Sequence, residues 1–313
     1  MPGAGHLAGA ISALAAVFIL HRVLKKPNDR PERIQAADER VLVLGASSGL
    51  GRTLVKQYAA RGAKVCAVAR RNDPLLELAQ ECGDRCLSYA ADLTKAADME
   101  RLRKHLLQQW DGLDTLHICA GVSAVQPLMA LTGVKSSDED PGVAGVERAA
   151  EIASRATQSN FVGPLIAALT FIPMMERTSA APAILLVSSV AAVVPAPTRA
   201  LYAATKAASL LLFQSLAIEH PDVAFTCVLP ATIEGNFRSS AVDADFSSQG
   251  SDEAHKKGLK VDYVASRCAE AADQGSRGNI VMPWFPYALA HHLYYMWPSF
   301  IEKQARKKYN FTA

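Results

Sequence analysis

The first 21 residues of this 313-residue chain contain no Asp, Glu, Lys or Arg. The apolar run LAGAISALAAVFIL lies within this stretch, and the basic residues Arg22, Lys25 and Lys26 follow it. A cleaved secretory signal carries its positive charge before the apolar run, so the opposite order argues against that interpretation. We therefore expect residues 1–25 to be a membrane anchor whose positive flank, with the rest of the chain, stays in the cytosol.

The length of this anchor does not decide whether it spans the membrane. Residues 7–24 would form about 27 Å of helix at about 1.5 Å per residue, whereas the hydrocarbon core of a bilayer is about 30 Å thick. Ala and Gly also make the run only moderately hydrophobic. The segment either spans the membrane or lies along its surface or against the protein.

A strong charge imbalance is also missing. The 33 basic and 30 acidic residues give a net charge of +3, so we expect no nucleic-acid partner. The six cysteines lie mostly in apolar runs, and Cys82 and Cys86 lack the second pair or nearby histidines that a zinc site needs. We expect free thiols and no metal.

Half of the residues are hydrophobic, which suits one large core. Short apolar runs alternate with helix-like stretches, a pattern typical of a parallel sheet with helices on both faces. The sequence predicts a single α/β domain with a doubly wound, seven-stranded parallel Rossmann sheet over residues 40–283, after a polar linker at 26–39. The expected strands lie within residues 41–44, 63–71, 85–94, 115–121, 183–189, 223–229 and 278–283.

The first strand leads directly into the turn GASSGLG and a helix expected over residues 52–61. Gly45 would allow the turn, Gly49 would let the backbone approach a pyrophosphate, and Gly51 would let the helix pack on the strand. A helix N-terminus also attracts phosphate groups, so the stretch predicts a dinucleotide site. The other residues of the turn expected to contact the dinucleotide are Ser47, Ser48 and Leu50.

No acidic residue stands at the end of the second strand, where one would accept hydrogen bonds from the ribose hydroxyls. Arg70 and Arg71 stand there instead, and they favour the 2′-phosphate of NADP over NAD. Arginines at a strand end are also ordinary surface residues. After the third strand, Asp92 and Leu93 are placed to contact adenine, although Asp92 would equally serve as a helix N-cap.

These features together resemble the short-chain dehydrogenase/reductase family over roughly residues 40–285. The glycine turn matches the family's nucleotide motif, and Tyr202 and Lys206 match its Y-x-x-x-K motif. By this resemblance Ser189 binds the substrate oxygen and Asn160 belongs to the proton relay. The resemblance also assigns cofactor contacts to Ala120, Gly121, Tyr202, Lys206, Pro230 and Ile233.

The chemistry explains why these residue types are needed. A carbonyl that receives hydride needs a proton and a hydrogen-bond donor beside its oxygen. A free tyrosine, with a pKa near 10, is a poor acid–base group at neutral pH. We expect Lys206 and the oxidised nicotinamide to favour phenolate and lower the pKa of Tyr202. In reduction Tyr202 would donate the proton, Ser189 would hold the oxygen, and Lys206 would hold the nicotinamide ribose.

Three positions depart from the family pattern. ICAG stands in place of N-N-A-G after the fourth strand, PATIEG replaces the P-G start after the sixth, and Leu44 replaces a threonine before the first glycine. The changes remove side-chain amides and a glycine near the cofactor. They leave the four expected catalytic residues intact, so we expect an active enzyme.

Three further segments are distinctive. Residues 134–151 are acidic and rich in breakers, which predicts an exposed loop ahead of a helix. Residues 236–262 are polar and stand where the family places its substrate lid. Residues 284–313 are aromatic with a basic end, and we expect them to lie at a membrane interface or, alternatively, against a partner subunit.

The anchor and the C-terminal segment resemble the microsomal branch of the family that acts on steroids, retinoids and other lipid alcohols or ketones. The resemblance implies an NADP(H)-dependent carbonyl reductase or alcohol dehydrogenase at the endoplasmic reticulum membrane. Its partners would be a hydrophobic small-molecule carbonyl or alcohol, membrane lipid and, in one arrangement, a second copy of the chain. A 3-ketosphinganine reductase and a non-catalytic nucleotide-binding membrane scaffold are the alternatives.

Overall fold

The structure, a computed structural model, describes residues 30–311 apart from residues 135, 137 and 244–257. The predicted anchor at residues 1–25 lies outside the described residues, as does the middle of the predicted lid at 236–262.

The described chain forms one sheet of seven parallel strands in the order β3-β2-β1-β4-β5-β6-β7. The order reverses direction between β1 and β4, and ligands of open α/β sheets bind outside the carboxyl ends of the strands at such a switch point. This confirms the predicted doubly wound Rossmann fold. The strands are β1 (Arg40–Leu44), β2 (Lys64–Ala69), β3 (Cys86–Ala90), β4 (Thr115–Ile118), β5 (Ala183–Val187), β6 (Ala224–Pro230) and β7 (Gly278–Met282).

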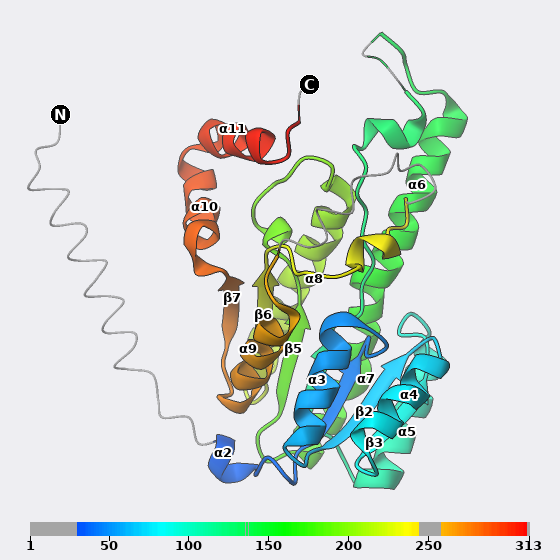
Figure 1. Cartoon of the computed structure of the whole chain (residues 1–313), viewed down its shortest axis with the longest axis vertical. Coiled ribbons are helices and arrows are strands. Elements are labelled where there is room, and N and C mark those ends of the chain that lie inside the picture. The colour runs from blue at the N-terminus through cyan, green and yellow to red at the C-terminus, as the bar shows by residue number, and fades with distance from the viewer. Residues whose placement is uncertain (1–29, 135, 137, 244–257, 312–313) are drawn as a thin grey trace, which may run out of the picture.

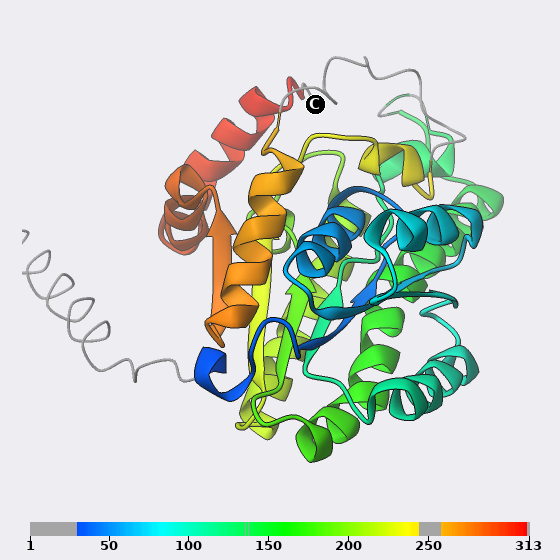
Figure 2. The same cartoon turned by 60° about the horizontal axis from the view of Figure 1, so that its bottom comes forward.

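Helices cover both faces of the sheet (Figure 1; Figure 2). The core places α3, α4 and α9 on one face and α5, α7 and α8 on the other. The α-helices are α2 (Arg30–Arg33), α3 (Gly49–Ala60), α4 (Asp73–Cys82), α5 (Ala96–Trp110), α6 (Val143–Thr157), α7 (Gly163–Thr178), α8 (Ala200–Glu219), α9 (Val261–Asp273), α10 (Trp284–Met296) and α11 (Pro298–Lys308). Shorter turns are η1 (Met129–Thr132), the π-helical η2 (Gln158–Val162), η3 (Val190–Ala192) and η4 (Phe237–Ser240).

The sequence of β1 shows why the strands are apolar throughout. Leu42 and Leu44 belong to the core cluster under α5 and α7, whereas Val41 and Val43 belong to the cluster under α3 and α9. Successive side chains of a strand point to opposite faces, and both faces are covered here. A continuous aliphatic run is therefore what this sheet requires.

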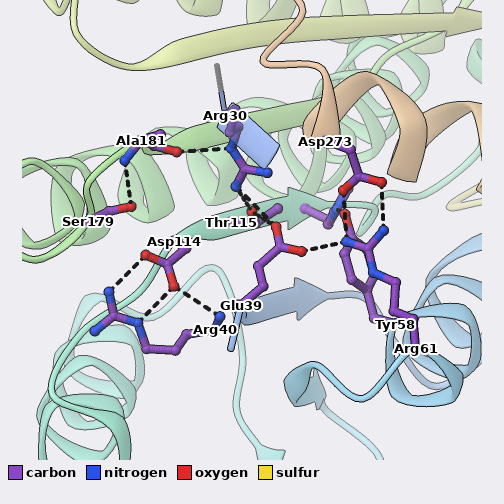
Figure 3. Close-up of polar contacts among 11 residues, drawn as sticks. Arg30, Glu39, Arg40, Tyr58, Arg61, Asp114, Thr115, Ser179, Ala181 and Asp273 are labelled. Carbon is purple, nitrogen blue, oxygen red and sulfur yellow. Dashed lines mark hydrogen bonds and ion pairs between the residues drawn. The ribbon is translucent and has the colours of Figure 1, made fainter. Parts of the chain in front are cut away.

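A buried network of charged groups closes the amino ends of the strands (Figure 3). The Glu39 carboxylate, 2% exposed, accepts hydrogen bonds from Arg30, Arg61 and the Thr115 hydroxyl. Arg61 also donates to both carboxylate oxygens of Asp273 on α9, at 2.6 and 2.7 Å. The network joins α2, α3, α9 and the starts of β1 and β4 at one place.

Arg30 attaches α2 to this network. Its guanidinium donates to Glu39 and, at 2.9 Å, to the carbonyl of Ala181 just before β5. Arg30 is only 4% exposed. Residues 26–39 were expected to be a polar linker, but from Arg30 onward the chain is tied to the domain by these long-range hydrogen bonds.

Two other boundaries differ from the sequence-based expectations. Helix α3 begins at Gly49, not at residue 52, because the two later glycines of the turn already form its first residues. The stretch expected to be an exposed loop over 134–151 is helical from Val143, where α6 begins after Pro141 and Gly142. The amphipathic order of VERAAEIASRA, with Ile152 and Ala156 buried, explains the earlier start.

Two helical stretches among the described residues are long and apolar enough to cross a membrane, Val143–Thr178 and Ala200–Glu219. Both pack on the sheet, since Phe171 of α7 and Phe213 of α8 are fully buried in the core. Burial within the protein therefore explains part of their hydropathy.

Candidate active site

A cavity of about 1330 Å³ opens at the carboxyl ends of the strands. It extends from the turn after β1, past the ends of β2 and β3, to the start of α8 and the C-terminal helices. Asn160 lies behind its wall, and all the other residues expected at the site line it. These are Gly45, Ser47, Ser48, Gly49, Leu50, Gly51, Arg70, Arg71, Asp92, Leu93, Ala120, Gly121, Ser189, Tyr202, Lys206, Pro230 and Ile233.

The glycine turn has the geometry that a phosphate site needs. Gly45 has φ +93°, and a Cβ there would lie 2.5 Å from the backbone nitrogen of Ala120. A Cβ on Gly51 would lie 2.2 Å from the carbonyl oxygen of Gly45, so the turn and helix pack too closely for any side chain. Gly49 has φ +50° and no atom within 4 Å of its Cβ position. The backbone at the start of α3 is thus open to an incoming anion.

The ends of β2 and β3 bring charged groups to the same cavity. Arg71 donates to the Ser47 hydroxyl at 3.3 Å, which places its guanidinium beside the glycine turn. The Asp92 carboxylate accepts from the backbone and hydroxyl of Thr94 at 3.0 and 2.8 Å. Burial would raise the pKa of Asp92, but these hydrogen bonds outweigh it and hold the pKa below its usual value. The sequence also suits Asp92 as a helix N-cap, but the N-cap of α5 is Lys95, so these bonds close a turn ahead of the helix while Asp92 lines the cavity.

Tyr202 lies in the first turn of α8 with its side chain 8% exposed. Burial raises the pKa of its phenol, while Arg199 and a hydrogen bond with Ser189 lower it. The net shift is upward, whereas we expected Lys206 and the nicotinamide to lower it. Lys206 lies 6.0 Å from the centroid of the Tyr202 ring and donates instead to the carbonyl of Val187 at 3.0 Å.

Burial makes the charged form of Lys206 unfavourable. It is 4% exposed, and burial lowers its pKa to about 8, with Cys119 acting weakly in the opposite direction. The Cys119 thiol, which faces it, has its pKa raised to about 12 by burial. No carboxylate forms an ion pair with Lys206 within the described part of the chain. An anionic ligand near this ammonium would gain from the charge that the protein leaves uncompensated.

Asn160 stands in η2, the π-helical turn between α6 and α7. Its amide oxygen accepts from the backbone of Val122 at 2.8 Å, and its amide nitrogen donates to the Val122 carbonyl and to Thr205, both at 3.0 Å. A π turn inside an α-helix often marks a functional position. Here it joins the loop after β4 to the helix that carries Tyr202 and Lys206.

The loop after β6 closes another side of the cavity. Pro230 ends β6, and Ile233 forms a parallel bridge with Leu259. Gly235, where the family usually has threonine, takes φ +112°. The backbone near Ile233 is therefore held in place although the usual side chains are absent.

Several cavity residues were not expected from the sequence. Phe237 packs edge-on against Tyr202, with ring centroids 6.1 Å apart. Arg199 places its guanidinium carbon 5.2 Å from the same ring. Arg238 and the C-terminal Tyr309 line the cavity nearby. Only the position of Arg199, three residues before Tyr202, could have suggested a role, because the others reach the site through tertiary packing.

The C-terminal helices form part of the cavity wall. The segment expected to lie at a membrane interface folds back over the site, and α10 and α11 contribute apolar lining. The residues involved include Phe285, Leu289, Leu293, Phe300 and Ile301.

Sequence comparisons agree with this architecture. The profile of the family described as short chain dehydrogenase matches residues 39–245. The chain is 32% identical over 203 residues to 11-beta-hydroxysteroid dehydrogenase-like 4A of Arabidopsis thaliana, a match that covers 62% of this chain and 60% of that protein. It is 28% identical over 262 residues to 11-beta-hydroxysteroid dehydrogenase A of Sesamum indicum, covering 80% and 70% of the two chains. The chain thus spans about three fifths of the length of the first of these relatives.

Solved structures share the fold. An alcohol dehydrogenase from Thermococcus sibiricus, complexed with 5-hydroxy-NADP, superposes with a TM-score of 0.61 at 23% identity, covering 78% of this chain and 95% of that one. A short chain dehydrogenase/reductase from Burkholderia phymatum in complex with NAD gives a TM-score of 0.69 at 19% identity, covering 84% and 96%. The chain therefore belongs to the short-chain dehydrogenase family, on the branch that resembles hydroxysteroid dehydrogenases.

Proposed function

We propose that the protein is an NADP(H)-dependent oxidoreductase that interconverts a carbonyl and an alcohol on a substrate with a large apolar part. The observation that carries this proposal is the meeting of Ser189, Tyr202 and Lys206 in the same cavity as the glycine turn. The open backbone at Gly49 and the arginines at the end of β2 suit a dinucleotide with a 2′-phosphate.

In this mechanism the bound cofactor supplies the hydride. Tyr202 donates a proton to the carbonyl oxygen, and Ser189 holds that oxygen through a hydrogen bond. The raised pKa of Tyr202 keeps the phenol protonated at neutral pH, which is the state that reduction requires.

The proton on Tyr202 must be replaced after each turnover. We assign this to the neighbourhood of Lys206 and Asn160, which both lie close to Gly121. A Cβ on Gly121 would lie 2.9 Å from the Asn160 oxygen and 3.2 Å from the Lys206 nitrogen. Glycine at this position therefore leaves the two polar groups close to each other.

Tyr202→Phe tests the assignment. We expect kcat to fall roughly 10²- to 10⁴-fold, because the phenol is the proton donor, while NADPH still binds. The absorbance of NADPH, followed with a panel of steroid, retinoid and keto-sphingoid ketones, measures hydride transfer. Fluorescence titration measures the binding of NADPH. Turnover that survives in the variant would contradict the catalytic role. Turnover absent from both proteins with NADPH bound would favour a nucleotide-binding scaffold, and selective reduction of the keto-sphingoid would favour a 3-ketosphinganine reductase.

We also propose contact with a membrane, at the endoplasmic reticulum, through residues 1–25 and the exposed side of α10–α11. Trp284, Tyr295 and Met296 there are 71%, 79% and 82% exposed. In both views α2, β7 and α10 lie along one side of the molecule, so this side could face a membrane that also holds the anchor (Figure 1; Figure 2). Trp and Tyr favour such an interface.

Liposome flotation tests the membrane contact. Trp284→Ser combined with Met296→Ser should weaken flotation further in a chain that already lacks residues 1–25. Leu76→Ser on α4, where the side chain is also exposed, is the matched control. Equal flotation of the two variants would contradict the contribution of α10.

A homodimer is a further proposal. Leu169 on α7 and Leu211 and Ile218 on α8 are 67%, 65% and 83% exposed, which suits burial against a second copy. Sedimentation of the full chain measures the oligomeric state, and Leu169→Glu should shift it toward monomer.

A further inference from the structure

The charge of the cavity is strongly asymmetric. It is lined by six basic and two acidic side chains. The two acids already have partners, because Asp92 accepts from Thr94 and Glu234 is 2.8 Å from Lys260. The basic residues are Arg70, Arg71, Arg199, Lys206, Arg238 and Lys308.

The cofactor that we propose accounts for only part of this charge. Arg70 and Arg71 suit a 2′-phosphate at the end of β2, and Lys206 suits the ribose and nicotinamide. Lys308 donates to the hydroxyl of Tyr287 within the C-terminal helices. Arg199 and Arg238 are left. Arg199 lies 5.2 Å from the centroid of the Tyr202 ring, and Arg238 follows Phe237, which packs against that ring.

Neither of these two guanidinium groups forms an ion pair with an acid among the residues that the structure describes. Arg199 donates from one nitrogen to the Ser123 hydroxyl at 2.7 Å and to the Ala124 carbonyl at 2.9 Å, both neutral groups. The nearby Asp243 uses its carboxylate on the backbone of Val125 and Gln126.

Arg238 is only partly exposed, and its guanidinium has no hydrogen bond to another described residue, although its backbone carbonyl accepts one from Ala241. Burial and the repulsion of Arg199 lower the pKa of its guanidinium. Two arginines near each other in a partly closed cavity destabilise each other unless an anion lies between or beside them. Arginine is also the side chain best suited to bind a carboxylate through two hydrogen bonds.

We propose that Arg199 and Arg238 bind an anionic group on the substrate, so that the substrate class is an apolar oxo acid or hydroxy acid with its carbonyl or alcohol close to the acid. This inference rests on the proposed function, whose catalytic tyrosine fixes where the carbonyl lies. The guanidinium of Arg199 is 5.2 Å from the Tyr202 ring centroid, so the acid lies a short chain away from the reacting carbon. The apolar body of the substrate lies against the C-terminal helices.

The test compares straight-chain oxo acids of increasing spacer length with their methyl esters, using the full chain and NADPH. The wild type should reduce the acid with a higher kcat/KM than the ester at the preferred spacer length. Arg238→Gln should lower the acid-to-ester ratio roughly ten- to a hundredfold, the usual effect of losing a charged hydrogen bond. Arg199→Lys should lower it less, because the charge remains.

General damage to the enzyme lowers kcat/KM for acid and ester alike, so it does not change the acid-to-ester ratio of a variant. Arg101 is an exposed arginine on α5 that does not line the cavity, so Arg101→Gln removes the same charge and should keep the wild-type ratio. An unchanged ratio in Arg238→Gln overturns the proposal. So does a wild type that treats acid and ester alike at every spacer length.

The anion could instead be a phosphate of the cofactor. In that case Arg238→Gln would raise the KM for NADPH to the same extent with acid and ester and leave their ratio intact, which also overturns the proposal. Binding of the oxo acid to the NADPH complex of Tyr202→Phe, measured by calorimetry, separates this inference from the proposed function. Acid binding that depends on Arg238, together with a wild type that transfers no hydride, supports the anion site and contradicts the proposed reaction.

Discussion

Arginines lie at both ends of the same sheet, but those at the amino ends of the strands have acidic partners and those that line the cavity have none among the described residues. At the amino ends of the strands, Arg30, Arg40 and Arg61 each pair with an acid, and the pairs are buried or half-buried. At the carboxyl ends, Arg199 and Arg238 line a cavity without an acidic partner among the described residues. Paired charges hold elements together, whereas charges left unpaired beside a cavity remain available to a ligand.

The largest effect on the free energy of unfolding should come from removing an ion pair at the amino ends of the strands. Glu39→Gln removes the carboxylate that the buried Arg30 shares with the half-buried Arg61, and breaking a buried pair costs about 3–5 kcal/mol. Urea unfolding followed by circular dichroism measures the loss. A loss of less than about 1 kcal/mol would mean that the network is not the clamp that its geometry indicates.

Lys206 lines the cavity and is buried, but it has no ion pair with a described residue, unlike the arginines at the amino ends of the strands. Its ordinary pKa of 10.5 is lowered to about 8, so the folded protein binds fewer protons than the unfolded chain between these pH values. Stability therefore rises with pH through that window. Below pH 8 the buried ammonium costs up to about 3 kcal/mol, an upper limit from the size of the shift.

Lys206→Met should consequently raise the Tm of the cofactor-free protein at pH 7 while abolishing turnover. The gain should disappear above about pH 11, where the wild-type lysine is neutral in both states. Scanning calorimetry at the two pH values measures this, with the exposed Lys104→Met on α5 as control. A gain that does not depend on pH would show that the effect is packing and not charge.

A smaller effect is expected from the arginines at the end of β2. Arg70→Gln combined with Arg71→Gln should lower the preference for NADPH over NADH roughly ten- to a hundredfold, because the charged hydrogen bonds to the 2′-phosphate are lost. Steady-state kinetics with both cofactors gives the preference. If NADH is already the better cofactor of the wild type, the assignment to NADP is wrong.

The smallest effect concerns the stability contribution of Arg238. Its removal breaks no ion pair and relieves repulsion with Arg199, so Arg238→Gln should change the free energy of unfolding by less than about 1 kcal/mol. The same urea titration used for Glu39→Gln makes the two ends directly comparable. A loss as large as that of Glu39→Gln would mean that Arg238 is a structural residue.

Local pattern was enough to predict the seven strands and the glycine turn, because both faces of each strand are buried and the turn has few alternatives. The family resemblance singled out Ser189, Tyr202 and Lys206, which the fold brings to one cavity. Sequence reasoning placed residues 26–39 in a linker, since nothing near Arg30 in the chain reveals that Glu39, Thr115 and Ala181 surround it.

The cavity wall shows the same limit more clearly. The aromatic C-terminal segment has the composition of a membrane-surface helix, and composition does not reveal that Phe300 and Ile301 turn toward the site. Arg238 lies in a polar, serine-rich stretch where an arginine is unremarkable. Its significance depends on Arg199, which is distant in the sequence and close in the fold.

The position of Arg30 has a practical consequence for handling the protein. Arg30 itself is held at the amino ends of the strands by its hydrogen bond to Ala181, whereas Tyr309 lines the cavity at their carboxyl ends. A purification tag or a solid support attached ahead of Arg30 would leave the cavity open to solvent. The same tag placed after Phe311 would begin at the rim and compete with whatever ligand enters there.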